Sequence, residues 1–480
     1  MPLNLHSFST KTQVLCLISI VAIPAWNAKQ KAVSDSTEIT NTNKSSTYTN
    51  YLGFGRSTAS VGDVNHDGFD DVVVGANSYG GANGDAGLVY LFLGGANGLQ
   101  ANAARKLSPK GNNDFGISMS SAGDINNDGF SDVIIGSYGK VAIYLGHKSG
   151  LSQEPLELIH DNEIVGFGNR VAAAGDVNKD GIDDVLITAS GDGKSGGKVF
   201  VYMGSDTGLL VNPATVIEGE SDDMGGYFGE SIASAGDVNH DGFADVIIGS
   251  TSANNFVGRA YIYLGSDAGL GDGLNAEPSV VLNGAGAMKY FGGAVATAGD
   301  VNHDGYSDVL VGAKGTDKIR GKAFLYLGGP EGLKDKPTVD FQSDEDDDRF
   351  GGAVSTAGDI NKDGFSDIII GARKATNADQ KGRAYVYLGS AAGLRDSPAN
   401  VLAGEEGGDG FGGTVSTAGD INHDGFSDIM IGAPGNRYLR NSLGGPETSV
   451  TGKVHVYKGG TKGLTSPPAK IVSGEKPPVY

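Results

Sequence analysis

The chain has 480 residues, with 57 acidic and 36 basic side chains and a formal net charge of −21. This excess of acid argues against a nucleic-acid partner, because nucleic-acid binding calls for a basic face. The only cysteine, Cys16, lies in an apolar segment near the N-terminus, so the remaining chain offers neither disulfides nor thiolate metal chemistry.

The first 50 residues are expected to precede the folded part of the protein. The apolar run from Val14 to Ala25 is shorter than the roughly 20 residues of a spanning helix. Residues 1–28 therefore indicate a secretory signal peptide, with an uncleaved anchor as the alternative. Residues 29–50 are rich in Ser, Thr, Asn and Lys and predict a flexible leader. We expect a mature chain without a transmembrane segment, either secreted or at the cell surface.

From residue 51 to residue 475 one unit recurs seven times, about every 60 residues, and residues 476–480 form a tail. Each unit opens with Phe-Gly and a run of small residues. A nine-residue loop of the form Asp-x-Asn-x-Asp-Gly-x-x-Asp follows, and then an apolar β-branched run that ends in Gly-Ala or a near variant. Repeat 3 departs from that ending with Thr188-Ala189. The repeats start near residues 54, 115, 167, 228, 291, 350 and 411.

The chemistry of the nine-residue loop points to a calcium ion. In known calcium loops, side chains at positions 1, 3 and 5 and a backbone carbonyl at position 7 bind the ion, and Gly at position 6 permits the turn. A helical-hand loop needs Glu at position 12, where this chain has Val or Ile, and the last carboxylate instead comes at position 9. We therefore predict a calcium loop between two strands.

Two alternatives to calcium remain at this point. A plain turn of Asp, Asn and Gly needs no metal, but three carboxylates within nine residues repel one another unless a cation lies between them. Magnesium prefers a few carboxylates plus waters to a multidentate protein cage. With up to seven Ca²⁺, the predicted ligands are, loop by loop, Asp63, Asn65, Asp67, Phe69 and Asp71; Asp124, Asn126, Asp128, Phe130 and Asp132; Asp176, Asn178, Asp180, Ile182 and Asp184; Asp237, Asn239, Asp241, Phe243 and Asp245; Asp300, Asn302, Asp304, Tyr306 and Asp308; Asp359, Asn361, Asp363, Phe365 and Asp367; and Asp420, Asn422, Asp424, Phe426 and Asp428.

The fourth loop position is the most conspicuous place for histidine in the chain. Four repeats have His there and the others have Asn or Lys, so we expect solvent-facing surface residues: His66, His240, His303 and His423. An enzyme of this architecture would need a repeat that breaks the pattern with a positioned acid, base or nucleophile. We find no such repeat and predict no catalytic residue.

The strand pattern predicts an all-β fold. Four short antiparallel strands per unit, repeated seven times, are typical of a seven-bladed β-propeller with the calcium loops between strands 1 and 2. One blade cannot bury both faces alone, so neighbours must stack. The small residues after Phe-Gly suit the innermost strand. The seventh repeat has its own fourth strand near Ala469–Ser473, so an exchanged N-terminal strand is not required, although Glu38–Thr42 could add one.

Phe-Gly, the aspartate loop and the Gly-Ala exit together resemble the FG-GAP repeats of the integrin α-subunit head, over roughly residues 51–475. The resemblance implies a seven-bladed propeller with Ca²⁺ on one rim and ligand-binding loops on the opposite face, in the connections from strand 4 to 1 and from strand 2 to 3. Integrin heads usually have calcium loops in only some blades, whereas all seven repeats have one here.

These features favour a non-catalytic binding or adhesion module for an extracellular protein or glycan. The connections opposite the calcium loops vary in length and charge, as binding loops on a rigid scaffold do. The longest runs from Pro434 to Thr451, and Ser343 to Arg349 is strongly acidic. A structural surface or matrix component is one alternative. An extracellular polysaccharide hydrolase or lyase that uses the central face is another.

Overall fold

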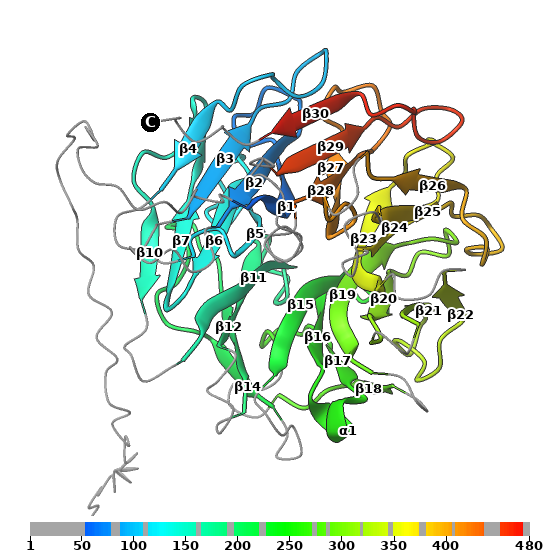
Figure 1. Ribbon diagram of the computed structural model, residues 1–480. Coiled ribbons are helices and arrows are strands. Elements are labelled where there is room, and N and C mark those ends of the chain that lie inside the picture. Colours follow the sequence, from blue (N-terminus) through cyan, green and yellow to red (C-terminus); the bar gives the residue numbers. More distant parts are fainter. Residues whose placement is uncertain are drawn as a thin grey trace, which may run out of the picture.

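The computed structural model describes most of the repeat region, and Figure 1 shows its sheets arranged radially around a central axis. The predicted signal peptide, leader and C-terminal tail lie outside the described residues, as do most of the two variable loops, Pro434–Thr451 and Ser343–Arg349. The described ranges are 53–77, 87–108, 114–159, 165–189, 196–219, 227–270, 276–284, 289–316, 320–343, 349–373, 381–405, 409–435 and 452–473.

Each blade is a four-stranded antiparallel sheet whose first strand is nearest the axis, which confirms the predicted seven-bladed propeller. The first strands are β1 (Phe54–Gly62), β5 (Ser118–Gly123), β11 (Phe167–Gly175), β15 (Phe228–Gly236), β19 (Phe291–Gly299), β23 (Phe350–Gly358) and β27 (Thr414–Gly419). The second strands are β2 (Asp71–Ala76), β6 (Asp132–Ser137), β12 (Asp184–Ala189), β16 (Asp245–Ser250), β20 (Asp308–Ala313), β24 (Asp367–Ala372) and β28 (Asp428–Ala433).

The two outer strands of each blade are shorter. The third strands are β3 (Leu88–Phe92), β7 (Lys140–Tyr144), β13 (Lys198–Tyr202), β17 (Arg259–Tyr263), β21 (Lys322–Tyr326), β25 (Arg383–Tyr387) and β29 (Lys453–Tyr457). The fourth strands are β4 (Arg105–Leu107), β10 (Leu156–Ile159), β14 (Thr215–Glu218), β18 (Val280–Asn283), β22 (Val339–Gln342), β26 (Asn400–Ala403) and β30 (Lys470–Ser473). Blade 2 adds a two-stranded turn, β8 (Gly146–His147) with β9 (Gly150–Leu151), and blade 4 adds the short helix α1 (Ala253–Phe256).

The first strand departs from the sequence expectation in two blades. In blades 2 and 7 it begins three residues after the Phe, so Phe115-Gly116 and Phe411-Gly412 precede the strand. Both phenylalanines are nevertheless fully buried, like their counterparts in the other blades. The phenylalanine is therefore required for packing rather than for the strand ladder.

The hydrophobic core lies between blades as well as within them. The buried cluster around Phe350, for example, combines Leu310 and Leu325 of blade 5 with Ile370 and Tyr387 of blade 6. Phe350 itself packs edge-on against Tyr385 of its own blade, with ring centroids 5.2 Å apart. Each blade thus buries its faces only by stacking on its neighbours, as a repeat architecture requires.

Two glycines of adjacent blades interlock at the seam between them. Gly351 follows the buried Phe350 with φ +75°, and a Cβ on it would lie 2.0 Å from the carbonyl oxygen of Lys322 in blade 5. A Cβ on Gly312, the Gly-Ala glycine of blade 5, would in turn lie 2.1 Å from the carbonyl oxygen of Gly351. The Phe-Gly and Gly-Ala motifs are therefore the two halves of one close backbone contact, made across the seam rather than within a blade.

The seam between blades 3 and 4 is packed differently. Thr188 takes the place of the Gly-Ala glycine, and its Oγ1 accepts a hydrogen bond from the Arg170 amide at 3.2 Å. A Cβ on Gly229 of blade 4 would be 3.2 Å from the Thr188 Cγ2. This seam is wide enough for a side chain, which explains how the departure seen in the sequence is accommodated.

Among the described residues, the seventh blade is completed by its own fourth strand, as the sequence predicts. β30 pairs with β29 of its own blade, and Figure 1 shows the red seventh blade beside the blue first blade. The seam between them has the same backbone bonds as the others, from the Asp70 amide to the Asp420 carbonyl at 3.3 Å and from the Gly95 amide to the Ile421 carbonyl at 3.0 Å.

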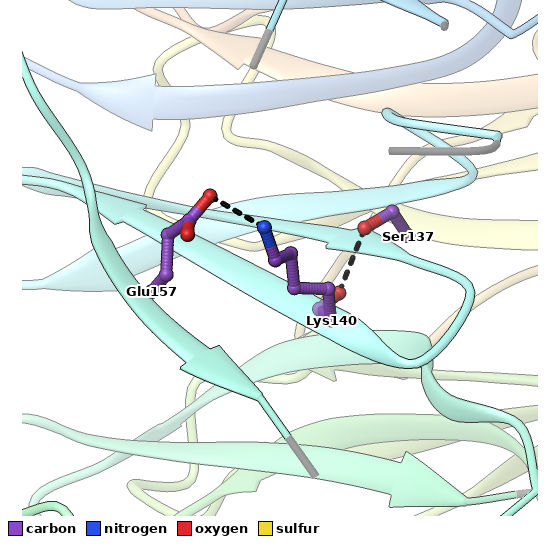
Figure 2. Close-up of polar contacts among 3 residues, drawn as sticks. All are labelled: Ser137, Lys140 and Glu157. Atoms are coloured by element: carbon purple, nitrogen blue, oxygen red, sulfur yellow. Dashed lines mark hydrogen bonds and ion pairs between the residues drawn. The ribbon is translucent and has the colours of Figure 1, made fainter. Parts of the chain in front are cut away.

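A lysine at the start of the third strand ties it to the fourth strand in several blades. In blade 2 the Lys140 Nζ lies 2.9 Å from a Glu157 carboxylate oxygen, and the Ser137 hydroxyl donates to the Lys140 carbonyl at 3.0 Å (Figure 2). Blades 3 and 5 repeat the ion pair as Lys198–Glu218 (2.6 Å) and Lys322–Asp340 (2.8 Å). Partly exposed pairs of this kind contribute about 0–1 kcal/mol each.

Candidate metal centres

The seven aspartate loops all lie on one rim of the propeller. In blade 1 the register pairs Gly62 with Asp71 at the loop end and Phe54 with Ala76 at the other end, and blades 3 to 6 follow the same scheme. Blades 2 and 7 keep the pair at the loop end, although their first strands begin after the Phe. The Phe-Gly and Gly-Ala motifs therefore mark the opposite rim, where the connections from strand 2 to 3 and from strand 4 to 1 also lie.

Hydrogen bonds within each loop shape the first six residues, as blade 6 illustrates. The Asp359 carboxylate accepts from the amides of Asp363 (3.1 Å) and Gly364 (2.8 Å), and the Asp363 carboxylate accepts from the Phe365 amide (3.1 Å). The Asn361 amide nitrogen donates to the Asp363 carboxylate at 2.8 Å. Gly364 has φ +89° with open space around it, so glycine is needed there for conformation rather than for room. Positions 1, 3 and 5 are thus brought together.

The ninth aspartate has a different environment. Asp367 is fully buried, and its two oxygens accept from the amides of Ile360 (3.0 Å) and Gly389 (2.8 Å). Burial, opposed by these two hydrogen bonds and assisted by the nearby Asp363 and Asp359, raises its pKa to about 7. The equivalent carboxyl groups are equally buried, with pKa values also raised to about 7: Asp71, Asp132, Asp184, Asp245, Asp308 and Asp428.

This carboxylate therefore joins its own loop to the turn that follows the third strand of the same blade. Position 2 of the loop supplies one amide and the glycine after the third strand supplies the other. Sequence reasoning assigned the ninth aspartate to metal binding alone and missed this role in the framework, because spacing does not reveal burial.

The donor set of the loops fits a hard cation such as Ca²⁺. Three buried oxygens in the loops have no hydrogen-bond partner, namely Oδ1 of Asn126, Oδ1 of Asn422 and Oδ2 of Asp428. The two asparagine oxygens are at position 3, where the equivalent oxygen of the other five loops accepts the position-5 amide, and the Asp428 oxygen is at position 9. Carboxylate, amide and carbonyl oxygens are the ligands that Ca²⁺ prefers. A bound cation would also offset the repulsion among the three carboxylates of each loop. Positions 1, 3 and 5 and the carbonyl of position 7 would hold it.

That the ninth aspartate binds the metal ion stays a prediction. Within the part of the chain that the structure describes, no three His, Cys, Asp or Glu side chains converge as a metal-holding group. The ninth carboxylate faces backbone amides instead, as Asp367 shows.

Backbone hydrogen bonds connect every loop to the next one around the rim. The amide at loop position 8 donates to the carbonyl of position 1 in the preceding blade, as Ser366 does to Asp300 at 3.0 Å. The carbonyl at position 2 accepts from the turn after the third strand of the following blade, as Val301 does from Ser390 at 3.1 Å. Both bonds occur at all seven seams, so the loops form a continuous ring of contacts.

The fourth-position histidines are exposed, as expected, but they do not simply face solvent. The His303 ring lies edge-on to Phe365 of the next blade, with ring centroids 6.0 Å apart, and the Lys179 Nζ lies 5.1 Å from the centre of the Phe243 ring. Sequence reasoning missed these partners. A signal was present, because the one repeat with an aliphatic residue at position 7, Ile182, follows the one repeat with Asn at position 4, Asn127.

Among the described residues, no helix is long and apolar enough to cross a membrane. The chain is similar to integrin alpha-5 of Xenopus laevis, with 28% identity over 314 residues that cover 62% of this chain and 28% of that protein. It is also similar to integrin alpha-V of Gallus gallus (31%; 48% of this chain and 22% of that protein) and to integrin alpha-PS3 of Drosophila melanogaster (33%; 40% and 17%). The chain thus spans less than a third of the length of these relatives.

A solved structure, Sqt1 of Chaetomium thermophilum, aligns over 89% of both chains at 13% identity and a TM-score of 0.47. The FG-GAP repeat family matches residues 54–92, 228–263, 291–326, 350–387 and 411–457. The FG-GAP-like repeat matches residues 124–187, so the two together match more than half of the chain. With the Phe-Gly and Gly-Ala seam and the seven blades, these matches show that the chain belongs to the FG-GAP repeat family.

Proposed function

We propose that this protein is an extracellular, non-catalytic binding or adhesion module whose propeller is stiffened by up to seven Ca²⁺. The observation that carries the proposal is the ring of seven like loops, each with oxygen donors at positions 1, 3, 5 and 7. In two of these loops the buried position-3 oxygen, of Asn126 and of Asn422, has no hydrogen-bond partner. Its relatives are integrin alpha chains, which favours adhesion over catalysis. The predicted signal peptide at residues 1–28 supports an extracellular location.

Calcium would supply positive charge and multidentate cross-linking at each loop. The chain's own residues prepare the loops for it. The first and fifth aspartates accept hydrogen bonds from amides of their own loop, which hold both carboxylates in place within the loop. The ninth aspartate fixes the loop to the body of the blade. Binding would therefore stiffen the rim without rearranging the sheets.

The opposite rim is the better candidate for the partner. Three exposed aromatic side chains lie there, namely Tyr138 between β6 and β7, Tyr227 just before β15, and Phe256 in α1 between β16 and β17. Each keeps roughly half of its surface exposed, at 55%, 45% and 45%. Tyrosine and phenylalanine are enriched at protein interfaces, and aromatic faces also suit sugars.

Backbone strain around Phe256 supports the same rim. Asn254, Asn255 and Phe256 have φ values of +52°, +57° and +64°, three consecutive left-handed residues without a glycine. Such conformations cost about 1–3 kcal/mol each and gather at functional sites. The amide of Tyr290 bonds to the Phe256 carbonyl at 3.1 Å, and the two rings lie edge-on at 6.5 Å. The exposed turn is thus held in place rather than left to relax.

A calcium titration with a stability readout tests the metal part. A ligand that binds only the folded state stabilises it by about 2.7 kcal/mol per site at one hundred times its dissociation constant. Millimolar Ca²⁺ should therefore raise the melting temperature well above that in excess chelator. Asp359→Ala should remove one bound ion and only part of the gain. An identical melt with and without chelator would refute calcium stiffening.

An array of extracellular proteins and glycans, probed with the secreted chain in calcium and in chelator, tests the binding part. We expect a ligand whose capture weakens in Tyr227→Ala and in Phe256→Ser. Ile471→Ser is the matched control, because Ile471 is also exposed but lies on the outermost strand β30. Calcium-dependent self-association without any ligand would favour the structural matrix alternative.

A further inference from the structure

The residue at loop position 4 has a left-handed backbone in every blade. The φ values lie between +54° and +60° and belong to His66, Asn127, Lys179, His240, His303, Lys362 and His423. Non-glycine residues adopt this conformation rarely, and Asn and His tolerate it better than β-branched residues do. In six of the blades the side chain then reaches the next loop.

The contact it makes is with the residue at position 7 of the following blade. Four seams use a histidine edge-on to an aromatic ring, and two use a lysine over a ring face. The ring-centroid distances are 5.8 Å for His66–Phe130, 6.0 Å for His240–Tyr306, 6.0 Å for His303–Phe365 and 6.2 Å for His423–Phe69, and the lysine distances are 5.1 Å for Lys179–Phe243 and 5.6 Å for Lys362–Phe426.

One seam lacks this contact. Between blades 2 and 3 the two positions hold Asn127 and Ile182, so neither side offers an aromatic ring. The backbone bond at that seam is present, from the Asp183 amide to the Asp124 carbonyl, but at 3.4 Å it is the longest of the seven. The chain thus contains its own control for the ring contact.

Position 7 has a second function in the same loop. Its carbonyl is a predicted calcium ligand and its amide donates to the fifth aspartate, as Phe365 does to Asp363 at 3.1 Å. Position 4 lies between two other predicted ligands, positions 3 and 5. One side-chain contact therefore joins the ligand shell of one loop to that of the next.

We propose that the residues at positions 4 and 7 are positioning residues that couple each calcium site to the next around the ring, with a break between blades 2 and 3. Filling one loop fixes its position-4 side chain, which then holds the position-7 residue of the next loop in place. The second ion meets a loop that is already ordered and binds more tightly. This coupling rests on the calcium binding proposed above and adds to it.

Competition of the purified protein with a chromophoric calcium chelator measures both the number of ions and the steepness of binding. The variants His303→Ala and Phe365→Ala remove the contact between blades 5 and 6, and His303→Lys restores the type of contact found at two other seams. Asn127→Ala is the matched control at the seam without a ring. Unfolding in chelator is recorded for each variant to separate coupling from simple loss of stability.

We expect every one of these variants to keep the wild-type number of ions. His303→Ala and Phe365→Ala should each weaken binding at the affected sites about two- to tenfold, the range for one ring contact, and flatten the binding curve. The double variant should lose no more than either single variant, because both remove the same contact. His303→Lys should recover the wild-type curve. Asn127→Ala shares with His303→Ala only the strain of a left-handed alanine, so it should shift the curve clearly less.

Two results would overturn the coupling alone. One is a wild-type chain that binds its ions with curves unchanged in His303→Ala and Phe365→Ala. The other is an Asn127→Ala curve that shifts as far as that of His303→Ala. A wild-type chain that binds no calcium at all overturns the proposed stiffening together with the coupling, so the two failures are distinguishable.

Discussion

Adding one methyl group at the seam between blades 5 and 6 tests the interlocked glycines. A Cβ on Gly312 would lie 2.1 Å from the Gly351 carbonyl oxygen of the neighbouring blade. Non-bonded carbon contacts are favourable at about 3.5–4.0 Å, so Gly312→Ala must push the two blades apart by more than about 1 Å. Backbone on both sides cannot rotate away as a side chain would.

We expect Gly312→Ala to lower the free energy of unfolding by about 2–4 kcal/mol, at or above the upper part of the range for overpacked cores. Urea denaturation in millimolar calcium measures this, so that loss of the proposed ions does not contribute. Gly364→Ala is the first control, because Gly364 has φ +89° and open space, and it should cost only the about 1–2 kcal/mol of a left-handed residue.

The equivalent position in blade 3 supplies the second control. Thr188 already places a side chain in its seam, so Thr188→Ala creates no clash and removes only one hydrogen bond and two heavy atoms. It should cost about 1 kcal/mol. A loss of stability in Gly312→Ala no larger than that in Gly364→Ala or Thr188→Ala would show that Gly312 and Gly351 do not interlock.

Three further variants test the loops, the core and the outer edge. Asp367→Ala should speed hydrogen exchange about fivefold or more at the two amides that its carboxylate accepts from, whereas Asp359→Ala should leave those amides protected, since each lost bond is worth about 1 kcal/mol. His455 is fully buried against Phe411, and burial lowers the pKa of its imidazole. Below about pH 6.5 the unfolded chain therefore binds a proton at His455 that the folded chain does not bind, and the free energy of unfolding falls. Between pH 7.5 and pH 5.0 in millimolar calcium, the melting temperature of His455→Phe should therefore fall by less than that of the wild type. An equal fall would contradict this. Lys140→Ala should change the free energy of unfolding by no more than about 1 kcal/mol, measured by urea denaturation, because its ion pair is partly exposed.

The arrangement within one blade follows from sequence spacing alone. The nine-residue loop, the apolar run after it and the turn glycines are local signals, and they place four strands in order along the chain. The pairing of β30 with β29 in the seventh blade follows for the same reason, since the seventh repeat contains its own fourth strand. The positions of the aspartates on one rim then come from the antiparallel register.

Contacts between blades were not predictable in the same way. Sequence shows that position 4 prefers His or Lys, but it contacts position 7 of the next loop only because neighbouring blades stack side by side. Burial is equally hidden from spacing. The ninth aspartate was predicted as a metal ligand and His455 belongs to none of the recurring motifs, yet both side chains are fully buried.

Blade 3 shows how such a ring tolerates a departure from its own pattern. Its seam with blade 2 lacks the ring contact, and its seam with blade 4 has Thr188 where the other blades have Gly. Arg170 bridges the second of these seams. Its amide donates to Thr188 at 3.2 Å, and its Nε donates across the seam to the Glu230 carbonyl at 2.9 Å. Hydrogen bonds to a side chain thus replace close backbone packing at that seam. A closed ring requires neighbouring blades to pack at every seam, but different seams can be stabilised by different contacts.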